Sequence, residues 1–461
     1  MDLHSTNLSR RAFLRRGACA ALGTTGLLST LAQLRVLAAG TAATSNLAVP
    51  ASEYKALVCV FLYGGNDANN LLIPYQQQAY NAYAQSRSIL ALPRASLLPI
   101  SPLGGGSYGL HPSAASLQRL FQSRRLAFLA NVGTLIAPVT KAQYESGGAA
   151  LPSQLFSHSD QSVQWQAALA DNPRKLGWGG RMADMLTAFN ETPGISMSMS
   201  LAGVNTWQNG GSTVQYQVSR DGAVSVDFLD EDWIPDLQKN SFTSLLDLER
   251  RNLFEQTLSG NTRRMIDNAQ LLNASLAAVP ATTAPFGDTE LGRQLRMISR
   301  LIQAGPSLGF RRQIFFASIG GWDTHDAQIQ AHAGLLTEFG NALEAFDQQL
   351  NTAGMGGQVT TFTASDFGRT FTTNGKGSDH GWGNHHIIMG GAVRGGELYG
   401  SFPQLVVDGP DDTGYGRWIP STSVDQYSAT LARWFGVPDS ELPTLFPNIG
   451  NFGTRDLGFM T

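Results

Sequence analysis

Short apolar runs alternate along this chain with segments of helical periodicity, and this alternation restricts the fold more than any other feature. The runs typical of strands cover residues 56–63, 126–132, 314–319, 359–364 and 387–390, the last continuing to 393. The helical patterns cover residues 112–123, 159–170, 291–304, 326–350 and 424–435. Nearly continuous apolar strands are typical of a sheet that is buried on both faces. The sequence therefore predicts an α/β fold, a doubly wound and mostly parallel sheet with helices on both faces.

The chain has no low-complexity linker and no internal repeat, so residues 50–461 are expected to form one large domain. The rhythm breaks at about residues 195–230, where polar and β-branched residues alternate around Asn209-Gly210-Gly211 and Arg220-Asp221-Gly222. Asn-Gly and Asp-Gly are typical two-residue hairpin turns. We expect a small β insertion here, which either roofs part of the ligand-binding face or extends the edge of the sheet.

The N-terminus has the features of an export signal. The segment Ser9-Arg10-Arg11-Ala12-Phe13-Leu14-Arg15 carries a twin-arginine pair, and a moderately apolar stretch follows from Ala18 to Leu34. That stretch is shorter than the roughly 20 apolar residues of a membrane-spanning helix. We therefore expect residues 1–38 to be a signal peptide for the twin-arginine translocase, with an uncleaved anchor as the alternative. The mature protein would be periplasmic or secreted, with no stable membrane span.

The net charge and the cysteine content exclude a nucleic-acid-binding protein and a fold held by disulfides. Loss of residues 1–38 would leave 27 Lys and Arg against 34 Asp and Glu, a net charge of −7. Nucleic-acid binding needs a concentrated basic surface, which this sequence lacks. Cys59 would be the only remaining cysteine, inside an apolar run where a small core side chain is expected. A disulfide within the mature chain is therefore excluded.

Acidic residues follow three of the predicted strands. Asp67 comes after the first strand and two glycines, Asp323 after the strand at 314–319, and Asp366 after the strand at 359–364. Strand ends are where an α/β sheet presents side chains to a ligand. Asp323 and His325 are two residues apart, so in an extended segment both side chains project to the same side. A carboxylate and an imidazole are zinc donors, and this pattern predicts a metal site. The alternative is that these residues cap turns.

Three of the eight histidines lie within seven residues, at His380, His385 and His386. His380 is the first choice as a ligand, because Gly377 and Gly381 give its backbone freedom. His385 and His386 are adjacent, so in an extended chain their side chains diverge and only one is expected to face the metal. A surface histidine cluster is the alternative interpretation.

Ser157 and His158 lie where an apolar segment meets a predicted helix start. A hydroxyl at a helix N-terminus is well placed to attack an anionic centre, since free amides and the helix dipole favour negative charge there. Ser157 and Asp160 also fit a capping box, so the serine is either a nucleophile or a cap. Arg369 is a fork-shaped donor suited to a phosphate or sulfate, unless it pairs with Asp366. Ser157, His158 and Arg369 are the candidate catalytic residues.

These motifs together resemble one bacterial exported family, known as domain of unknown function 1501. The likeness runs in the same order over essentially the whole mature chain. It rests on the leader and on these segments: Tyr63-Gly64-Gly65-Asn66-Asp67, Leu110-His111-Pro112, Ser157-His158, Gly321-Trp322-Asp323-Thr324-His325, Ser365-Asp366-Phe367-Gly368-Arg369-Thr370 and Gly377-Ser378-Asp379-His380-Gly381.

That family is grouped with the alkaline phosphatase and sulfatase superfamily, whose members hold two metals at strand ends around a nucleophile at a helix start. The resemblance implies metal ligands at these residues: Asp67, Asp323 with His325, and Asp366. Phe367 stands where the superfamily has the histidine of a Ser-Asp-His-Gly turn. That ligand is either missing or supplied by one of the three residues His380, His385 and His386.

The sequence thus favours an exported metal-dependent hydrolase of phosphate or sulfate esters, acting on a small ester or a polymer. One or two divalent ions are expected, with zinc, calcium, magnesium and manganese all open. The alternative is a metal-binding or scaffolding protein that keeps the fold without turnover.

Overall fold

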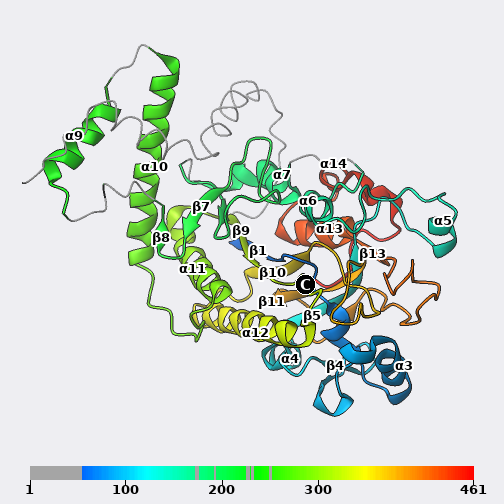
Figure 1. Cartoon of the computed structure of the whole chain (residues 1–461). Coiled ribbons are helices and arrows are strands. Elements are labelled where there is room, and N and C mark those ends of the chain that lie inside the picture. The colour runs from blue at the N-terminus through cyan, green and yellow to red at the C-terminus, as the bar shows by residue number, and fades with distance from the viewer. Residues whose placement is uncertain (1–53, 172–175, 192–193, 225–228, 230–232, 249–251) are drawn as a thin grey trace, which may run out of the picture. The chain divides into compact units, whose positions relative to one another are not determined.

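The computed structural model describes residues 54–171, 176–191, 194–224, 229, 233–248 and 252–461 (Figure 1). The expected signal peptide at 1–38 lies outside these residues. Contacts along the chain separate two compact units. The described part of the first unit holds α9 (Asp236–Leu246) and the start of α10 (Leu253–Ala277). The second unit, residues 49–234 and 264–461, holds the elements described below. Within the described residues, no helix is both long and apolar enough to cross a membrane.

A ten-stranded sheet forms the centre of the second unit, in the order β12-β5-β11-β10-β1-β9-β6-β7-β8 with β13 beside β5. Its long strands are β1 (Lys55–Leu62), β5 (Leu126–Gly133), β9 (Arg312–Ile319), β10 (Val359–Ser365) and β11 (Asn384–Gly390). The short strands β12 (Leu398–Tyr399) and β13 (Thr422–Ser423) run parallel to β5. β1 is parallel to β9 and β10, whereas β11 is antiparallel to β10 and β5. The predicted α/β fold with a mostly parallel sheet is confirmed.

The register of the three central strands positions the site. Leu62 at the end of β1 pairs with Ile319 at the end of β9 and with Ser365 at the end of β10. Because these strands are parallel and in step, their following loops leave the sheet at one edge. The motifs after β1, β9 and β10 are therefore brought together.

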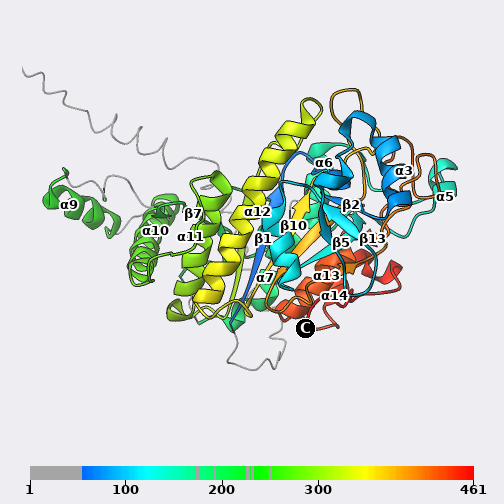
Figure 2. The same cartoon turned by 90° about the horizontal axis from the view of Figure 1, so that it is seen from below.

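Helices cover both faces of the sheet, as predicted (Figures 1 and 2). One face carries α4 (Ala115–Gln122), α11 (Glu290–Ala304) and α12 (Gln328–Thr352). The other carries α6 (His158–Ala167), α7 (Trp178–Leu186) and α13 (Val424–Phe435). A capping box begins α13, since the Ser423 hydroxyl accepts from the Gln426 amide and the Gln426 side chain accepts from the Ser423 amide.

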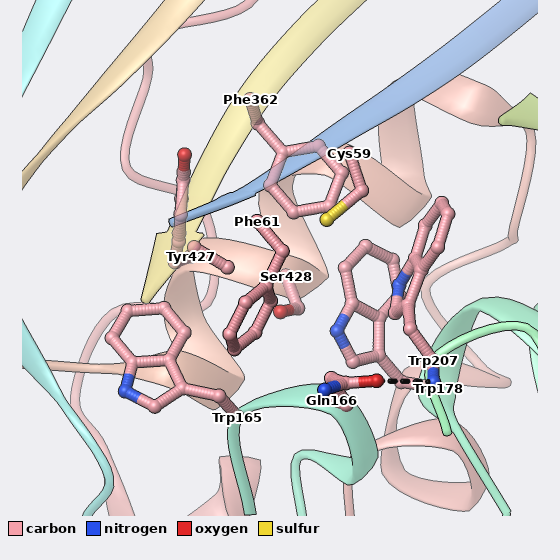
Figure 3. Close-up of a pocket in the computed structure, with 10 residues that line it drawn as sticks. Cys59, Phe61, Trp165, Gln166, Trp178, Trp207, Phe362, Tyr427 and Ser428 are labelled. Atoms are coloured by element: carbon pink, nitrogen blue, oxygen red, sulfur yellow. Dashed lines mark hydrogen bonds between the residues drawn. The ribbon is translucent and has the colours of Figure 1, made fainter. Parts of the chain in front are cut away.

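The layer between the sheet and the second helical face is closely packed. Figure 3 shows Cys59, Phe61 and Phe362 of the strands pointing toward aromatic rings that include Trp165 and Tyr427. The cavity between them is about 10 Å³, at the lower limit of the space that a single water molecule needs. Cys59 is buried here, as expected for a core residue.

The segment expected as a β insertion extends the sheet edge. β6 (Ser198–Ser200) pairs with β9, β7 (Tyr216–Ser219) pairs with β6, and β8 (Gly222–Ala223) pairs with β7. The β7–β8 hairpin turns at Arg220-Asp221, but the loop at Asn209-Gly210-Gly211 is not a hairpin turn. Instead, the Asp184 carboxylate holds that loop by accepting from the backbone amides of residues 211–213.

A separate antiparallel sheet of three short strands has the order β2 (Leu72–Pro74), β4 (Tyr108–Leu110), β3 (Leu98–Ile100). It follows β1 together with α3 (Gln77–Arg87), a helix that the apolar pattern did not predict. Two short helices, α5 (Lys141–Glu145) and α14 (Leu442–Leu445), complete the unit.

Candidate metal centre

Five of the predicted site residues meet at the edge where β1, β9 and β10 end. Asp323 and His325 follow β9, and Asp366 follows β10 directly. His158 is the first residue of α6, and His380 precedes β11. The parallel register directs the segments after β9 and β10 to this edge, and the antiparallel β11 starts beside the end of β10. Residues up to 222 positions apart in the chain thus become neighbours.

The carboxylate of Asp323 is the focus of the cluster. Its Oδ1 atom accepts a hydrogen bond from Arg369 Nη1 at 2.7 Å and lies 3.0 Å from His325 Nε2. The Nε2 atoms of His158 and His380 each lie 3.5 Å from the same oxygen. The Asp323 side chain is 45% exposed, so the focus of the cluster is open to solvent.

Each of the three imidazoles has its Nδ1 atom bound to an oxygen. His158 Nδ1 lies 2.7 Å from Asp366 Oδ2, and His325 Nδ1 lies 2.9 Å from Asp379 Oδ1. His380 Nδ1 lies 2.7 Å from the carbonyl oxygen of Phe156. Because these oxygens accept, each Nδ1 carries a proton, and in the neutral form of each ring the lone pair is on Nε2. The contacts therefore aim three lone pairs at the Asp323 carboxylate.

Lone pairs arranged in this way need a cation. His325 Nε2 and His380 Nε2 are only 2.9 Å apart, and two lone pairs facing at that distance repel unless a proton or a metal ion satisfies them. His158 Nε2 is buried and has no hydrogen-bond partner in the described residues. His158, Asp323 and His380 offer ligand atoms within 4.8 Å of one another. The residues present thus fit a divalent ion bound by imidazole nitrogen and carboxylate oxygen.

The ionisation of these groups also suits a cation. Burial pushes the pKa of Asp323 upward, but the hydrogen bond and charge of Arg369, with the nearby histidines, hold that pKa below its usual value. Burial lowers the pKa of His380, so its ring is neutral at pH 7. Burial raises the pKa of Asp366, and the hydrogen bonds from His158 and the Gly64 amide offset part of that rise. A charged Asp323 and neutral imidazoles are the states that bind metal.

The Phe367 side chain lies beside the cluster, at the position where the superfamily's Ser-Asp-His-Gly turn has a histidine. Its ring is fully buried and lies 4.7 Å from the His158 ring and 4.6 Å from the His380 ring, between centroids. Gly65 packs against it so closely that a Cβ there would come within 2.6 Å of the Phe367 ring, with a backbone φ of +83°. An apolar ring supplies no ligand, so the geometry favours one ion rather than two.

Asp67 does not join this cluster. Its side chain is fully buried, and Oδ2 accepts short hydrogen bonds from Arg87 Nη2 and from Gln328 Nε2. At the sharp turn after β1 it forms a buried ion pair, while its Oδ1 atom has no partner among the described residues, so its expected role as a metal ligand stays a prediction. Arg87 also donates to the carbonyl oxygens of Thr370 and Phe371, which follow β10.

Arg369 is placed as a structural donor, in contrast to the anion clamp that we expected. The side chain is completely buried, and it donates to Asp323 and to the carbonyl oxygens of Gly64 and Ser378. It therefore holds Asp323 in position and joins the loops after β1, β9 and β10. The alternative pairing with Asp366 is not formed, because Asp366 pairs with His158.

His385 and His386 lie on β11 inside the fold, and the expectation that one of them faces the metal is not met. His385 Nδ1 accepts from the Asn131 amide at 3.0 Å, and His386 Nδ1 lies 3.2 Å from the Thr363 hydroxyl. Their rings contact different partners, Phe402 for His385 and Trp165 for His386, so the predicted divergence is present. Burial lowers the pKa to about 4 for His385 and about 3 for His386. Both rings are neutral core side chains at pH 7.

Ser157 occupies the N-cap position of α6, next to the cluster. Its hydroxyl donates to Asp160 Oδ2 at 2.5 Å and makes no capping bond to a backbone amide. The preceding residue, Phe156, has a φ of +73°, a strained value for a residue with a side chain, and its carbonyl binds His380. The serine is thus held between two residues that contact the histidine cluster.

Several residues of the cluster escaped the sequence reasoning. Asp379 was noted beside His380 but not as the partner of His325, although its acidic side chain within the Ser378-Asp379-His380 motif was a signal. Arg87 and Gln328 gave no motif, because they lie at the end of α3 and at the start of α12, away from the strand ends. The Phe156 carbonyl is a backbone group, which no residue type could reveal.

The fold and the cluster define an α/β protein that presents histidines and carboxylates at the ends of parallel strands. Its family follows from comparison of the sequence. A model of the family described as "Protein of unknown function (DUF1501)" matches residues 54–439, and the chain belongs to this family. No curated protein matches the chain.

Solved structures with some similarity include a synthase, a sulfatase and a periplasmic domain in complex with Zn. The lipoteichoic acid synthase LtaP from Listeria monocytogenes has a TM-score of 0.38 and 8% identity, over 92% of this chain and 78% of that one. The PsFucS1 sulfatase from Pseudoalteromonas sp. has a TM-score of 0.34 and 10% identity, over 85% of this chain and 69% of that one. The C-terminal periplasmic domain of EcEptC from Escherichia coli, in complex with Zn, has a TM-score of 0.31 and 9% identity, over 74% and 73%. These scores are low, so the fold assignment rests on the strand order given above.

Proposed function

We propose that this protein is an exported, metal-dependent hydrolase of phosphate or sulfate esters. One observation carries the proposal: three imidazoles, each with Nδ1 bound to an oxygen, aim their Nε2 atoms at one half-exposed carboxylate. Such carboxylate–histidine contacts orient metal ligands in enzymes. His158, Asp323 and His380 would hold a single divalent ion, with His325 beside them.

An ion at this position would polarise an ester oxygen and lower the pKa of a bound water. The residues around it supply the rest. Ser157 lies at the N-terminus of α6, where backbone amides favour an anionic substrate, and Asp160 Oδ2 accepts a hydrogen bond from the Ser157 hydroxyl. Asp379 holds His325 on the exposed side, where an imidazole can accept or return a proton.

A second candidate, a metal-binding protein without turnover, is favoured by two of the contacts described above. Phe367 removes a ligand from the neighbouring position, and the buried Arg369 has no exposed donor for a substrate anion. Metal content would be the same for both candidates. Only turnover separates them.

The test is a panel of aryl phosphates, phosphodiesters and aryl sulfates assayed with metal-loaded protein before and after chelation. We expect hydrolysis of at least one ester, abolished by the chelator and restored by added metal. Ser157→Ala should reduce kcat by roughly a hundredfold or more if the serine is the nucleophile. Thr140→Ala is the matched control, since Thr140 caps the remote helix α5. Metal-replete protein without turnover on the whole panel would leave the non-catalytic candidate.

We also propose that residues 1–38 direct the protein through the twin-arginine pathway, from the motif at 9–15. Replacement of both Arg10 and Arg11 by lysine should leave precursor in the cytoplasm, because the arginine pair is the feature that the translocase recognises. Fractionation followed by immunoblotting measures this. Normal maturation of the double variant would contradict the proposed route.

A further inference from the structure

A second polar hollow lies at the far edge of the sheet, formed by segments that contribute nothing to the metal centre. Its volume is about 450 Å³, within the range of small-molecule sites. It is lined by the β7–β8 hairpin, the segment after α10 and one side of α11, which Figure 1 shows near one another. The lining residues are Arg220, Asp221, Ala281, Thr282, Arg296, Met297 and Arg300.

Three guanidinium groups line this hollow against one carboxylate, in a protein whose net charge is −3. Arg296 and Arg300 are four residues apart on α11 and therefore share one face of the helix. Like charges at that spacing destabilise a helix, so the pair needs compensation from elsewhere. Arg220 adds a third positive charge from the hairpin.

Among the described residues, acidic side chains supply little of this compensation. The Arg296 guanidinium has no hydrogen bond or ion pair in the described part of the chain, although the residue is partly buried. Arg300 donates one hydrogen bond, from Nη2 to the Leu276 carbonyl at 2.8 Å, which fixes its direction without neutralising it. Arg220 makes a loose contact of 3.4 Å with Glu290, and both side chains are about half exposed.

We infer that this hollow binds a small ligand that carries two or more phosphate or sulfate groups. Planar guanidinium forks bind such oxyanions through paired hydrogen bonds, and the Thr282 hydroxyl adds a further donor. Ala281 and Met297 provide an apolar wall for the body of the ligand. The site shares no residue with the metal centre, and the inference does not depend on the proposed hydrolase function.

The test is calorimetric titration of the mature protein with methylenediphosphonate, a dianionic probe that an ester hydrolase cannot cleave. The double variant Arg296→Gln/Arg300→Gln should bind the probe at least about tenfold more weakly, since charged hydrogen bonds are lost. Arg296→Gln alone loses no described partner, so it should fold normally and still weaken binding. Arg455→Gln, the same charge change at an exposed position outside the hollow, is the matched control and should leave binding unchanged.

A bisphosphonate also binds metal ions, so Asp323→Asn distinguishes the two sites. Binding retained in Asp323→Asn and lost in the arginine variants supports the inference. Binding lost in Asp323→Asn but unchanged in both arginine variants would place the probe on the metal and overturn it. Equal affinity in all of these proteins, or no binding to the native protein, would overturn it as well.

Discussion

Replacing Asp323 by alanine should remove the divalent ion from the protein, together with any hydrolysis that depends on it. The Oδ1 atom of the charged Asp323 carboxylate lies within 3.5 Å of the Nε2 atoms of all three histidines. Losing a residue that hydrogen-bonds a metal ligand typically costs about 10- to 100-fold in metal affinity, and the loss of a direct ligand should exceed about 100-fold. Elemental analysis of the purified protein and competition with a chromogenic chelator measure the effect.

Two further variants make this result specific. Asp323→Asn keeps an oxygen that can accept from Arg369, so it preserves the buried contact while it removes the charged ligand. Asp326→Ala is the matched control, because that exposed carboxylate contacts only Lys376 and its neighbouring Ala327 amide among the described residues. Unchanged metal content in Asp323→Ala, or native protein without any metal, would show that the cluster is a network of turns and caps.

Replacing Arg87 by methionine should destabilise the fold by about 3–5 kcal/mol, because it leaves the Asp67 carboxylate buried without its charged partner. The surrounding contacts add to the loss. Arg87 also binds Asn70 and the two carbonyls after β10, so its removal loosens the loops that lead to the metal centre. Urea unfolding of the variant and the native protein, followed by circular dichroism, measures the free energy of unfolding.

Arg119→Met is the matched control for the buried pair. Arg119 forms an ion pair with Glu344, but its side chain is 56% exposed, and such pairs contribute less than about 1 kcal/mol. The double variant Asp67→Asn/Arg87→Met should be less destabilised than the two single losses combined, since no unpaired charge remains. A loss in Arg87→Met as small as in Arg119→Met would contradict a charged, buried Asp67.

Much of the fold was predictable because local patterns carry it. The apolar run at 56–63 became β1 at Lys55–Leu62, and the helical pattern at 424–435 became α13 at Val424–Phe435, which a capping box begins. Strand burial and helical periodicity depend on residues close in the chain, and so does a cap. The same reasoning placed Asp323, His325 and Asp366 at strand ends, since it needs only the strand and the residues that follow.

The tertiary structure alone decided which partner each polar group has. Asp67 and Asp366 both follow buried strands, yet one pairs with Arg87 of α3 and the other with His158 of α6. Gln328 reaches Asp67 across 261 positions of the chain. Such pairings depend on strand register and on the helix that covers each strand end. By itself the sequence determined the α/β sheet and the edge where the site lies, because these follow from patterns within single elements. Only the tertiary structure determined which carboxylate is exposed at that edge and which is neutralised beneath it, because burial is set by segments that meet in space.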